Sequence, residues 1–532
     1  MKCLALTPPV RWSGQCWGSI FSSKPSTKFC QPIVPEYQVD AIFPKLHNRQ
    51  VVLGAARSRQ VKTLEPGDHL YKRLSWLGDP NLDAILVLQK WVDEGRKIGK
   101  WKLQAYVKSL RKYGRYRHAL QVSEWISSRP DYQLAPADCA IRLDLIAKVH
   151  GIQSAENYFE GLPDVAKNKL TYGSLLNVYA REKLAGKAEA VMETIERSGY
   201  DISTLDYNVM MNLYMNTCQF EKVQLMFQKM RESGVLPDAY SYNIWITTCA
   251  TMSDLDKMEQ VMDEVKRDNN VNKNWTIYST LATMYMKAGL IDKAETALDE
   301  LKRKMRQKDR SAHEFLISLY ASIGNKEEVY RSWQSLKSAF PRVLNRSYIF
   351  ILSSLVKIGD TKGAEDIFKE WESVCVRYDI RIANILISVY VRQNLLENAE
   401  LLIERISQRG GKPNCNSWEM LAEIYIQNGM FEKAVIAMKN IASVGTFIQW
   451  QPKPENVLAI LTHFEKHGDI EGAKNIFEII KDINCVNTEM YNSFLRTFIE
   501  AGKTDIEILE QMRKTVSPNE ETEMLLRQVC KS

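Results

Sequence analysis

The sequence has few residues that break helices and no apolar run long enough to cross a membrane. Its 532 residues include only 25 glycines and 17 prolines, which favours helices joined by short connections over an all-β chain. No stretch of about 18 uninterrupted apolar residues occurs, so we expect no membrane insertion. The apolar share of 45% and the charged share of 25% are ordinary for a folded chain.

The sequence also lacks the residue clusters of common metal sites. None of the ten cysteines lies within four residues of another, which excludes CxxC zinc pairs and the disulfide framework of small secreted proteins. His463 and His467 are four residues apart, but no Glu follows the first, as the zinc-protease pattern requires. The His-x-Glu and Pro-Cys-x-x-Cys set of zinc deaminases is missing too. We therefore expect no catalytic residue, no metal site, no cofactor and no enzymatic activity.

Acidic residues are missing from positions 1–35, where several Ser and Thr accompany four cations. This composition is typical of an organelle transit peptide, although a disordered tail would look similar. Of the net charge of +7, +6 lies in residues 1–60, so the rest of the chain offers no strong overall attraction to nucleic acid. We predict a transit peptide and disordered segment over residues 1–60, directed to the mitochondrion, with the chloroplast as the alternative.

What the sequence does contain is a repeat of about 35 residues. Tyr172, Tyr207, Tyr242 and Tyr278 are 35, 35 and 36 residues apart. Glycines continue the period, with Asn394 in one glycine position: Gly78, Gly114, Gly151, Gly289, Gly324, Gly359, Asn394, Gly429, Gly468 and Gly502. A period of this length indicates a stack of small helical units.

Each period predicts two helices. In 278–287, Leu281, Met284 and Tyr285 recur at helical spacing, and Gly289 ends that helix because glycine accepts the left-handed conformation. A second helix follows from about Ile291. A small residue five positions after the glycine would let the two helices approach: Ala294, Val329, Ala364, Ala399, Ala434 and Ala473. The predicted fold is all-α, an α-solenoid of stacked helix-turn-helix repeats.

Several motifs resemble the pentatricopeptide repeat (PPR) family, in its plain (P-type) plant organellar form. They are Leu236-Pro237-Asp238-Ala239-Tyr240-Ser241-Tyr242-Asn243, Lys412-Pro413-Asn414-Cys415-Asn416-Ser417-Trp418-Glu419, Met284-Tyr285-Met286-Lys287-Ala288-Gly289 and Met490-Tyr491-Asn492-Ser493. The Trp and Leu-Gly signature of tetratricopeptide repeats is not present. The resemblance implies a right-handed superhelix. It divides the chain into the segment 1–60, degenerate N-terminal repeats over 64–169, a repeat array over 170–519 and a capping helix over 520–532.

The resemblance also implies binding of single-stranded organellar RNA, about one base per unit. A polar residue just after the first-helix aromatic, together with the last residue of the same unit, would read the base; we call these two residues a reading pair. Asn208 with Asp238 resembles a uracil reader, and Ser279 with Asp309 a purine reader that prefers guanine. Three pairs resemble pyrimidine readers that prefer cytosine: Asn243 with Asn274, Asn384 with Asn414, and Asn492 with Asn519.

Five units carry no pair that can be read in this way. They are Gly173 with Ser203, Glu314 with Leu344, Ile349 with Asp379, Glu419 with Lys453, and Leu458 with Asn487. A lone Asn in the first turn of a helix often bonds the backbone instead of a ligand. The leading hypothesis is an RNA-binding adaptor acting in organelle RNA processing, stability, splicing or translation. The alternative is a protein–protein scaffold in an organellar ribosome or RNA-processing complex.

Two basic stretches are further candidates for contact with phosphates. The first interleaves cations with aromatics: Arg96, Lys97, Lys100, Trp101, Lys102, Tyr106, Lys108, Arg111, Lys112, Tyr113, Arg115, Tyr116 and Arg117. Such a pattern suits a groove that tracks phosphates and stacks bases, or equally a solvated helix face. The second stretch, 302–308, lies where cations also favour the end of a helix.

Overall fold

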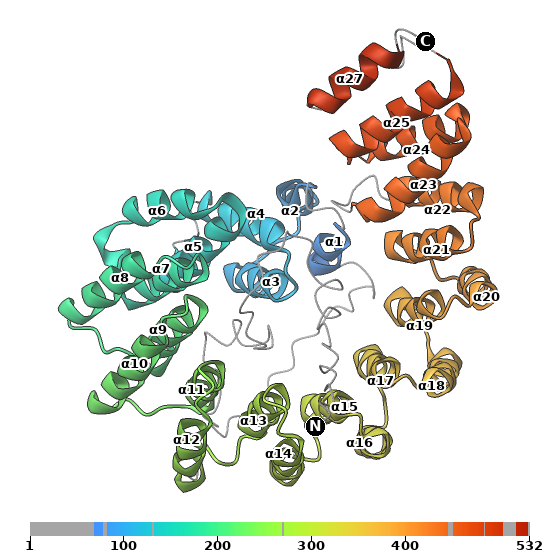
Figure 1. Ribbon diagram of the computed structural model, residues 1–532. Coiled ribbons are helices and arrows are strands. Elements are labelled where there is room, and N and C mark those ends of the chain that lie inside the picture. The colour runs from blue at the N-terminus through green and yellow to red at the C-terminus, as the bar shows by residue number, and fades with distance from the viewer. Residues whose placement is uncertain are drawn as a thin grey trace, which may run out of the picture.

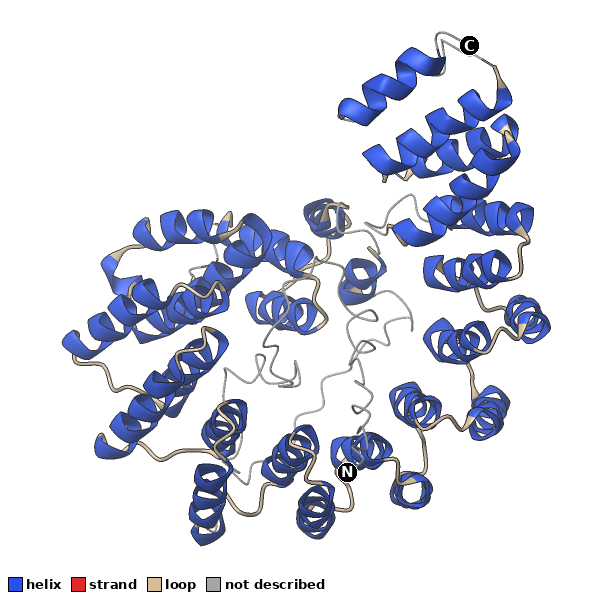
Figure 2. Ribbon diagram, viewed as in Figure 1, coloured by secondary structure: helices blue, strands red, loops and turns tan. Residues whose placement is uncertain are grey.

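The computed structural model describes residues 69–77, 82–129, 132, 134–268, 271–444, 451–483, 485–503 and 518–529. The transit-peptide prediction for residues 1–60 and the glycine Gly78 lie outside these residues. Within them the chain is built from helices joined by short turns (Figure 2). No helix among the described residues combines the length and apolar character needed to span a bilayer.

The helices alternate between two positions in a repeated pair. The first helices are α1 Leu70–Trp76, α3 Lys100–Lys112, α5 Pro136–His150, α7 Lys169–Arg181, α9 Thr204–Asn216, α11 Ala239–Thr251, α13 Trp275–Lys287, α15 Arg310–Ile323, α17 Asn345–Lys357, α19 Ile380–Arg392, α21 Cys415–Gln427, α23 Pro454–His467 and α25 Thr488–Ala501. The second helices are α2 Ala84–Asp93, α4 Tyr116–Ser127, α6 Ile152–Glu160, α8 Ala185–Arg197, α10 Phe220–Glu232, α12 Leu255–Arg267, α14 Ile291–Lys304, α16 Lys326–Ala339, α18 Thr361–Val374, α20 Leu396–Gln408, α22 Phe431–Val444 and α24 Ile470–Asp482. A 3₁₀ turn spans Asp164–Ala166 and the last described helix is α27 Glu520–Val529.

The pairs stack into an arc whose inside is lined by first helices. From α11 to α20 the first helices face the hollow of the arc and the second helices form its outer rim (Figure 1). From α5 to α25, each first helix packs against the next first helix. Among the helices that the structure describes, second helices touch one another extensively only at α2 with α4 and at α22 with α24. Closer packing on one side than on the other bends the stack, which confirms the predicted α-solenoid.

The small residues predicted five positions after the turn are all fully buried. Ala294, Val329, Ala364, Ala399, Ala434 and Ala473 are each 0% exposed. In the unit of α13 and α14, Ala294, Ala297, Leu298 and Leu301 form the buried face of the second helix, as the periodicity predicts. Small side chains here allow α14 to approach α13, so the hydrophobic core runs between paired helices and from unit to unit.

The turns between paired helices use a residue with positive φ at each predicted glycine that the structure describes, and at Asn394, where φ is +53°. Gly289 has φ +76°, and a Cβ built on it would meet nothing within 4 Å. Three earlier units hold the same conformation without glycine: Lys183, Cys218 and Ser253 have φ between 58° and 59°. These three turns were not predicted, although their residues continue the spacing of about 35 residues back from Gly289.

We expect glycine at these three positions to stabilise the protein. The left-handed conformation costs an L-residue about 1–2 kcal/mol. Glycine avoids this cost, but it also increases the conformational entropy of the unfolded chain, which offsets part of the gain in stability. Lys183→Gly, Cys218→Gly and Ser253→Gly should each raise the free energy of unfolding by about 0.5–1 kcal/mol. Urea denaturation measures the change. Gly289→Ala is the opposite control and should lower stability, because no side-chain clash obscures the backbone effect there.

A second contact recurs in two units, that of α9 with α10 and that of α21 with α22, and joins each of them to the preceding pair. The Tyr214 hydroxyl of α9 donates to Glu189 of α8 at 2.9 Å, and Lys222 of α10 reaches the same carboxylate at 2.8 Å. Tyr425 and Lys433 repeat this arrangement on Glu400, at 2.8 and 3.0 Å. One carboxylate thus ties a second helix to both helices of the following unit, which holds the angle between units.

Candidate nucleic-acid interface

Each predicted reading residue is the fifth residue of a first helix, and each predicted partner immediately precedes the next first helix. Asn208 is the fifth residue of α9, for example, and Asp238 is the N-cap of α11. Four partners accept a hydrogen bond from a backbone amide of the helix that they cap: Asp238, Asn274, Asp309 and Asn414. Asn519 accepts from the Thr522 amide in the same way at 2.8 Å. The partner residues are therefore helix caps, and the fifth-position residues are not.

Two of the five pairs are joined by a direct hydrogen bond. The Asn208 Nδ2 amide donates to Asp238 Oδ1 at 3.1 Å, and the Asn384 Nδ2 amide donates to Asn414 Oδ1, also at 3.1 Å. Both bonds cross from one first helix to the cap of the next. Asn384 is half-buried, whereas Asn208 is only 2% exposed. The structure therefore repeats one polar arrangement in the seam between successive first helices, in units 176 residues apart.

A hydroxyl on the following helix completes this arrangement. The Ser241 hydroxyl lies 2.7 Å from Asn208 Oδ1 and 3.0 Å from Asp238 Oδ1. The Ser417 hydroxyl lies at the same two distances from Asn384 Oδ1 and Asn414 Oδ1. The sequence analysis did not single out these serines. Their signal is positional, since each is the third residue after a cap, where Ser or Thr closes a capping box.

The remaining three pairs lack the direct bond. Thr522 links Asn492 Oδ1 to Asn519 Oδ1 at 2.6 and 2.7 Å, but Asn492 Nδ2 donates to Glu521 at 3.1 Å. Asn243 Nδ2 donates to Thr276 at 3.3 Å, and Thr276 bonds Asn274 at 2.9 Å.

The purine-reading pair is also apart in the structure. The Ser279 hydroxyl donates to the Thr276 carbonyl of its own helix at 2.7 Å. Asp309 instead accepts from the Trp275 indole at 2.8 Å. Ser279 and Asp309 are therefore placed at the expected positions of their unit without a hydrogen bond between them.

Two units place a carboxylate at the fifth position. Glu314 is 1% exposed and is held by the Ser347 hydroxyl at 2.7 Å and by Arg346 at 3.0 Å. Glu419 accepts from the Lys453 backbone amide at 2.6 Å. Burial raises the pKa of Glu419. These side chains lie between successive first helices, at the same position as Asn208. A carboxylate there accepts hydrogen bonds, whereas the asparagine amide can also donate one.

The first basic stretch divides into structural and exposed cations. Arg111 pairs with Asp144 at 2.7 Å, and Arg115 donates to the Ser75 carbonyl at 2.7 Å. Lys108 and Lys112 are exposed on α3 together with Trp101, which is 68% exposed. Part of the stretch thus holds α3 in place, and part remains open to solvent. In the second stretch, Lys302 pairs with Glu328 of the following unit at 3.1 Å.

Three cations converge on one buried carboxylate near the N-terminal end. Asp144 of α5, 7% exposed, lies 2.7 Å from Arg111 of α3, 3.3 Å from Lys148 and 3.1 Å from Arg181 of α7. Burial opposes ionisation of Asp144, but the attraction of the three cations outweighs it and lowers the pKa of the carboxyl. The cluster joins three consecutive first helices.

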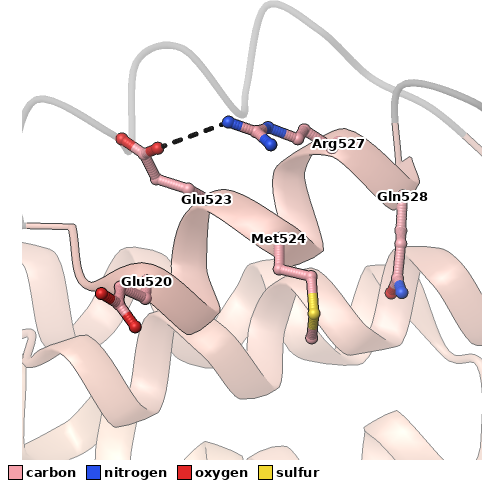
Figure 3. A pocket seen from close by; sticks show the side chains of 5 residues that line it. All are labelled: Glu520, Glu523, Met524, Arg527 and Gln528. Atoms are coloured by element: carbon pink, nitrogen blue, oxygen red, sulfur yellow. Dashed lines mark ion pairs between the residues drawn. The ribbon is translucent and has the colours of Figure 1, made fainter.

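A shallow hollow lies on α27, the helix that follows Asn519. It is lined by Glu520, Glu523, Met524, Arg527 and Gln528, with Arg527 3.9 Å from Glu523 (Figure 3). Thr522, the residue of α27 that contacts Asn492, is fully buried and does not line the hollow. None of the predicted reading residues lines the hollow.

The fold and the repeated polar seam define a helical-repeat protein, and comparisons with known proteins specify its family. Residues 203–251 match the PPR repeat family model. The PPR repeat model matches residues 170–200, 240–270, 276–305, 346–375 and 382–411. A mitochondrial pentatricopeptide repeat-containing protein of Arabidopsis thaliana is 36% identical over 468 residues, which cover 87% of this chain and 86% of the relative. The chain belongs to the pentatricopeptide repeat family.

Two further similarities carry specific names. A large ribosomal subunit protein of Arabidopsis thaliana is 38% identical over 464 residues, covering 86% of this chain and 94% of the relative. The crystal structure of the maize pentatricopeptide repeat protein PPR10 aligns with a TM-score of 0.47 at 18% identity, over 86% of this chain and 65% of that chain.

Proposed function

We propose that this protein binds single-stranded RNA in the mitochondrion through its reading pairs, as a non-catalytic adaptor in RNA processing, stability, splicing or translation. Membership of the PPR family supports RNA as the ligand, since PUF and PPR repeats read about one base per unit. Several similar Arabidopsis proteins are named as mitochondrial, which supports the mitochondrion over the chloroplast. In this proposal residues 1–60 act as the transit peptide and 170–519 as the RNA-contacting array.

The observation that carries the proposal is the repeated hydrogen bond between an amide and the next cap. The hydrogen bond from Asn208 to Asp238 has the same length as the bond from Asn384 to Asn414. In both units a serine hydroxyl also bonds the oxygen of the first asparagine. An amide held in this way has a fixed pattern of donors, which a base edge can match. Asn384, which is only half-buried, leaves part of its side chain open for such a contact. The proposed readings are uracil for Asn208 with Asp238 and cytosine for Asn384 with Asn414.

The other three pairs contribute in the same register. Asn243 with Asn274 and Asn492 with Asn519 are proposed pyrimidine readers, and Ser279 with Asp309 a purine reader. In the units with Glu314 and Glu419, a buried carboxylate supplies only acceptors when ionised. We propose that these two units interrupt the run of base contacts.

Selection from a pool of single-stranded RNA, repeated at several salt concentrations, tests the proposal. The full-length protein should enrich a short, pyrimidine-leaning sequence. The double variant Asn208→Ala, Asn384→Ala should lose about 1–3 kcal/mol of binding free energy for each base contact removed. Asn475→Ala on the exposed face of α24 is the matched control. The absence of any enriched sequence, or equal affinity of the double variant and the control, would defeat RNA reading.

A protein scaffold in a mitochondrial ribosome is the second candidate function. The similarity to a ribosomal subunit protein over 94% of that relative favours it, as do the carboxylates of Glu314 and Glu419 in the reading register. Affinity capture from mitochondria distinguishes the two functions. Protein partners that remain bound after nuclease treatment support the scaffold, whereas partners lost with the RNA support the adaptor.

A further inference from the structure

The hydroxyl that completes each polar seam comes from the unit after the one whose base would be read. We propose that Ser241, Ser417 and Thr522 are positioning residues that fix the orientation of Asn208, Asn384 and Asn492, so that each base is specified by three residues rather than two. This inference rests on the proposed RNA-binding function and deepens it. It concerns which atoms of the amide face the base.

Each of these hydroxyls has a single proton to donate. The backbone amide of Asn414 donates to the Ser417 oxygen at 3.1 Å, and that of Asp238 donates to the Ser241 oxygen at 3.1 Å. Each hydroxyl oxygen is therefore already an acceptor. The Ser417 proton is directed to Asn384 Oδ1, and the Ser241 proton to Asn208 Oδ1. In both units this oxygen is the nearer of the two acceptors, at 2.7 Å.

An amide whose oxygen is held in this way must turn its nitrogen to the other side. In Asn384 that nitrogen donates one of its two hydrogens to Asn414 Oδ1 at 3.1 Å. One N–H remains for a ligand. A donor in this position selects a base edge that carries an acceptor, such as a pyrimidine carbonyl. Without the hydroxyl, only the bond from Asn384 Nδ2 to Asn414 Oδ1 would oppose a 180° rotation of the amide. The rotated amide would present its oxygen, which would select a donor.

Asn243 provides a natural comparison within the same chain. The third residue of the following helix is Ile277 rather than Ser or Thr. Thr276, one position earlier, accepts from Asn243 Nδ2, and Asn243 Oδ1 is buried without a hydrogen-bond partner. The oxygen of this amide is not held by a hydroxyl, so the unit of α11 should discriminate between bases less sharply than the units of α9 and α19.

The test measures base discrimination rather than affinity alone. Wild-type protein first defines the preferred RNA by selection from a pool, and dissociation constants are then measured with each base at each position. Ser417→Ala should reduce the pyrimidine-over-purine preference about 10-fold at one nucleotide. Ser417→Thr keeps the hydroxyl and should retain the preference.

A second variant and a matched control separate positioning from stability. Ser241→Ala should reduce the preference at a different nucleotide, five positions from the one affected by Ser417→Ala, because α9 and α19 are five units apart. The Thr171 hydroxyl accepts from the Asn168 backbone amide at 2.9 Å, as Ser241 and Ser417 do from their caps. The fifth residue of the preceding first helix is Ala140, so Thr171 has no asparagine amide to orient. Thr171→Ala should therefore leave discrimination unchanged at every position.

The outcomes distinguish the two proposals. If wild-type protein enriches no sequence, the proposed function fails and the positioning role fails with it. If wild-type protein selects a sequence but Ser417→Ala and Ser241→Ala, both folded by circular dichroism, discriminate as well as wild type, the positioning role alone is overturned. An equal loss in Thr171→Ala would also overturn it, because the effect would then follow from the lost cap.

Discussion

Replacing Asn384 with Ser and Asn414 with Asp should convert one unit from a pyrimidine reader to a purine reader. The double substitution Asn384→Ser, Asn414→Asp reproduces the pair formed by Ser279 and Asp309. Serine is shorter than asparagine, which leaves room for the larger purine, and its hydroxyl can both donate and accept. The preference at one nucleotide should shift by about 10–100-fold, the range expected for one well-placed base contact.

Dissociation constants for RNAs that differ at that single nucleotide measure the shift. Ser417 remains unchanged in this variant and can bond the new cap, because Ser241 already contacts Asp238 in the same geometry. Asn475→Ser is the control and should leave all preferences intact. An unchanged preference at every nucleotide would mean that these two positions do not read a base.

Removing the Asp144 carboxylate should give the largest change in stability. Asp144→Ala leaves Arg111, Lys148 and Arg181 close together without the anion that pairs with all three. Breaking a buried ion pair by removing one partner costs about 3–5 kcal/mol. Because contacts in a repeat protein are between neighbours, the loss should fall on α3, α5 and α7 rather than on the whole chain. Amide hydrogen exchange, resolved by helix, is the measurement.

An exposed aspartate provides the matched control. Asp263 pairs with Lys266 at 3.0 Å, and both side chains are 62% exposed, so Asp263→Ala should cost less than about 1 kcal/mol. The Asp144 contribution should also depend on pH. Since the folded-state pKa is lowered, the contribution is complete above the ordinary Asp value of 3.8 and is lost as the pH falls through the lower folded value. Equal exchange rates in wild type and Asp144→Ala would contradict this account.

Much of the architecture could be predicted from residue spacing. The turn at Gly289 and the buried face of Ala294, Ala297, Leu298 and Leu301 follow from helical periodicity and glycine's freedom to adopt positive φ. The turns at Lys183, Cys218 and Ser253 were not predicted, because none of these residues is a typical left-handed residue. There the packing of the paired helices imposes the conformation.

The candidate site was only partly predictable. The positions of Asn208 and Asn384 follow from the register of the repeat, but their contacts with Ser241 and Ser417 cross from one unit to the next. Such contacts depend on how closely two first helices approach. The same applies to Arg111 and Arg115, which belong to a basic stretch in the sequence. In the structure Arg111 pairs with Asp144, and Arg115 donates to a backbone carbonyl, so both cations have partners within the protein.

Residue spacing alone predicts the repeat, the two helices of each unit, the residues that face the core and the register of the proposed reading pairs. These properties are local, since helical periodicity, caps and turn residues act within about 35 residues of chain. Which polar side chains meet depends instead on how the helices pack in three dimensions. The distance between successive first helices governs three such contacts. They are the direct pairing of Asn208 with Asp238, the indirect contact of Asn243 with Asn274, and the convergence of three cations on Asp144. That distance is set by packing along the whole stack.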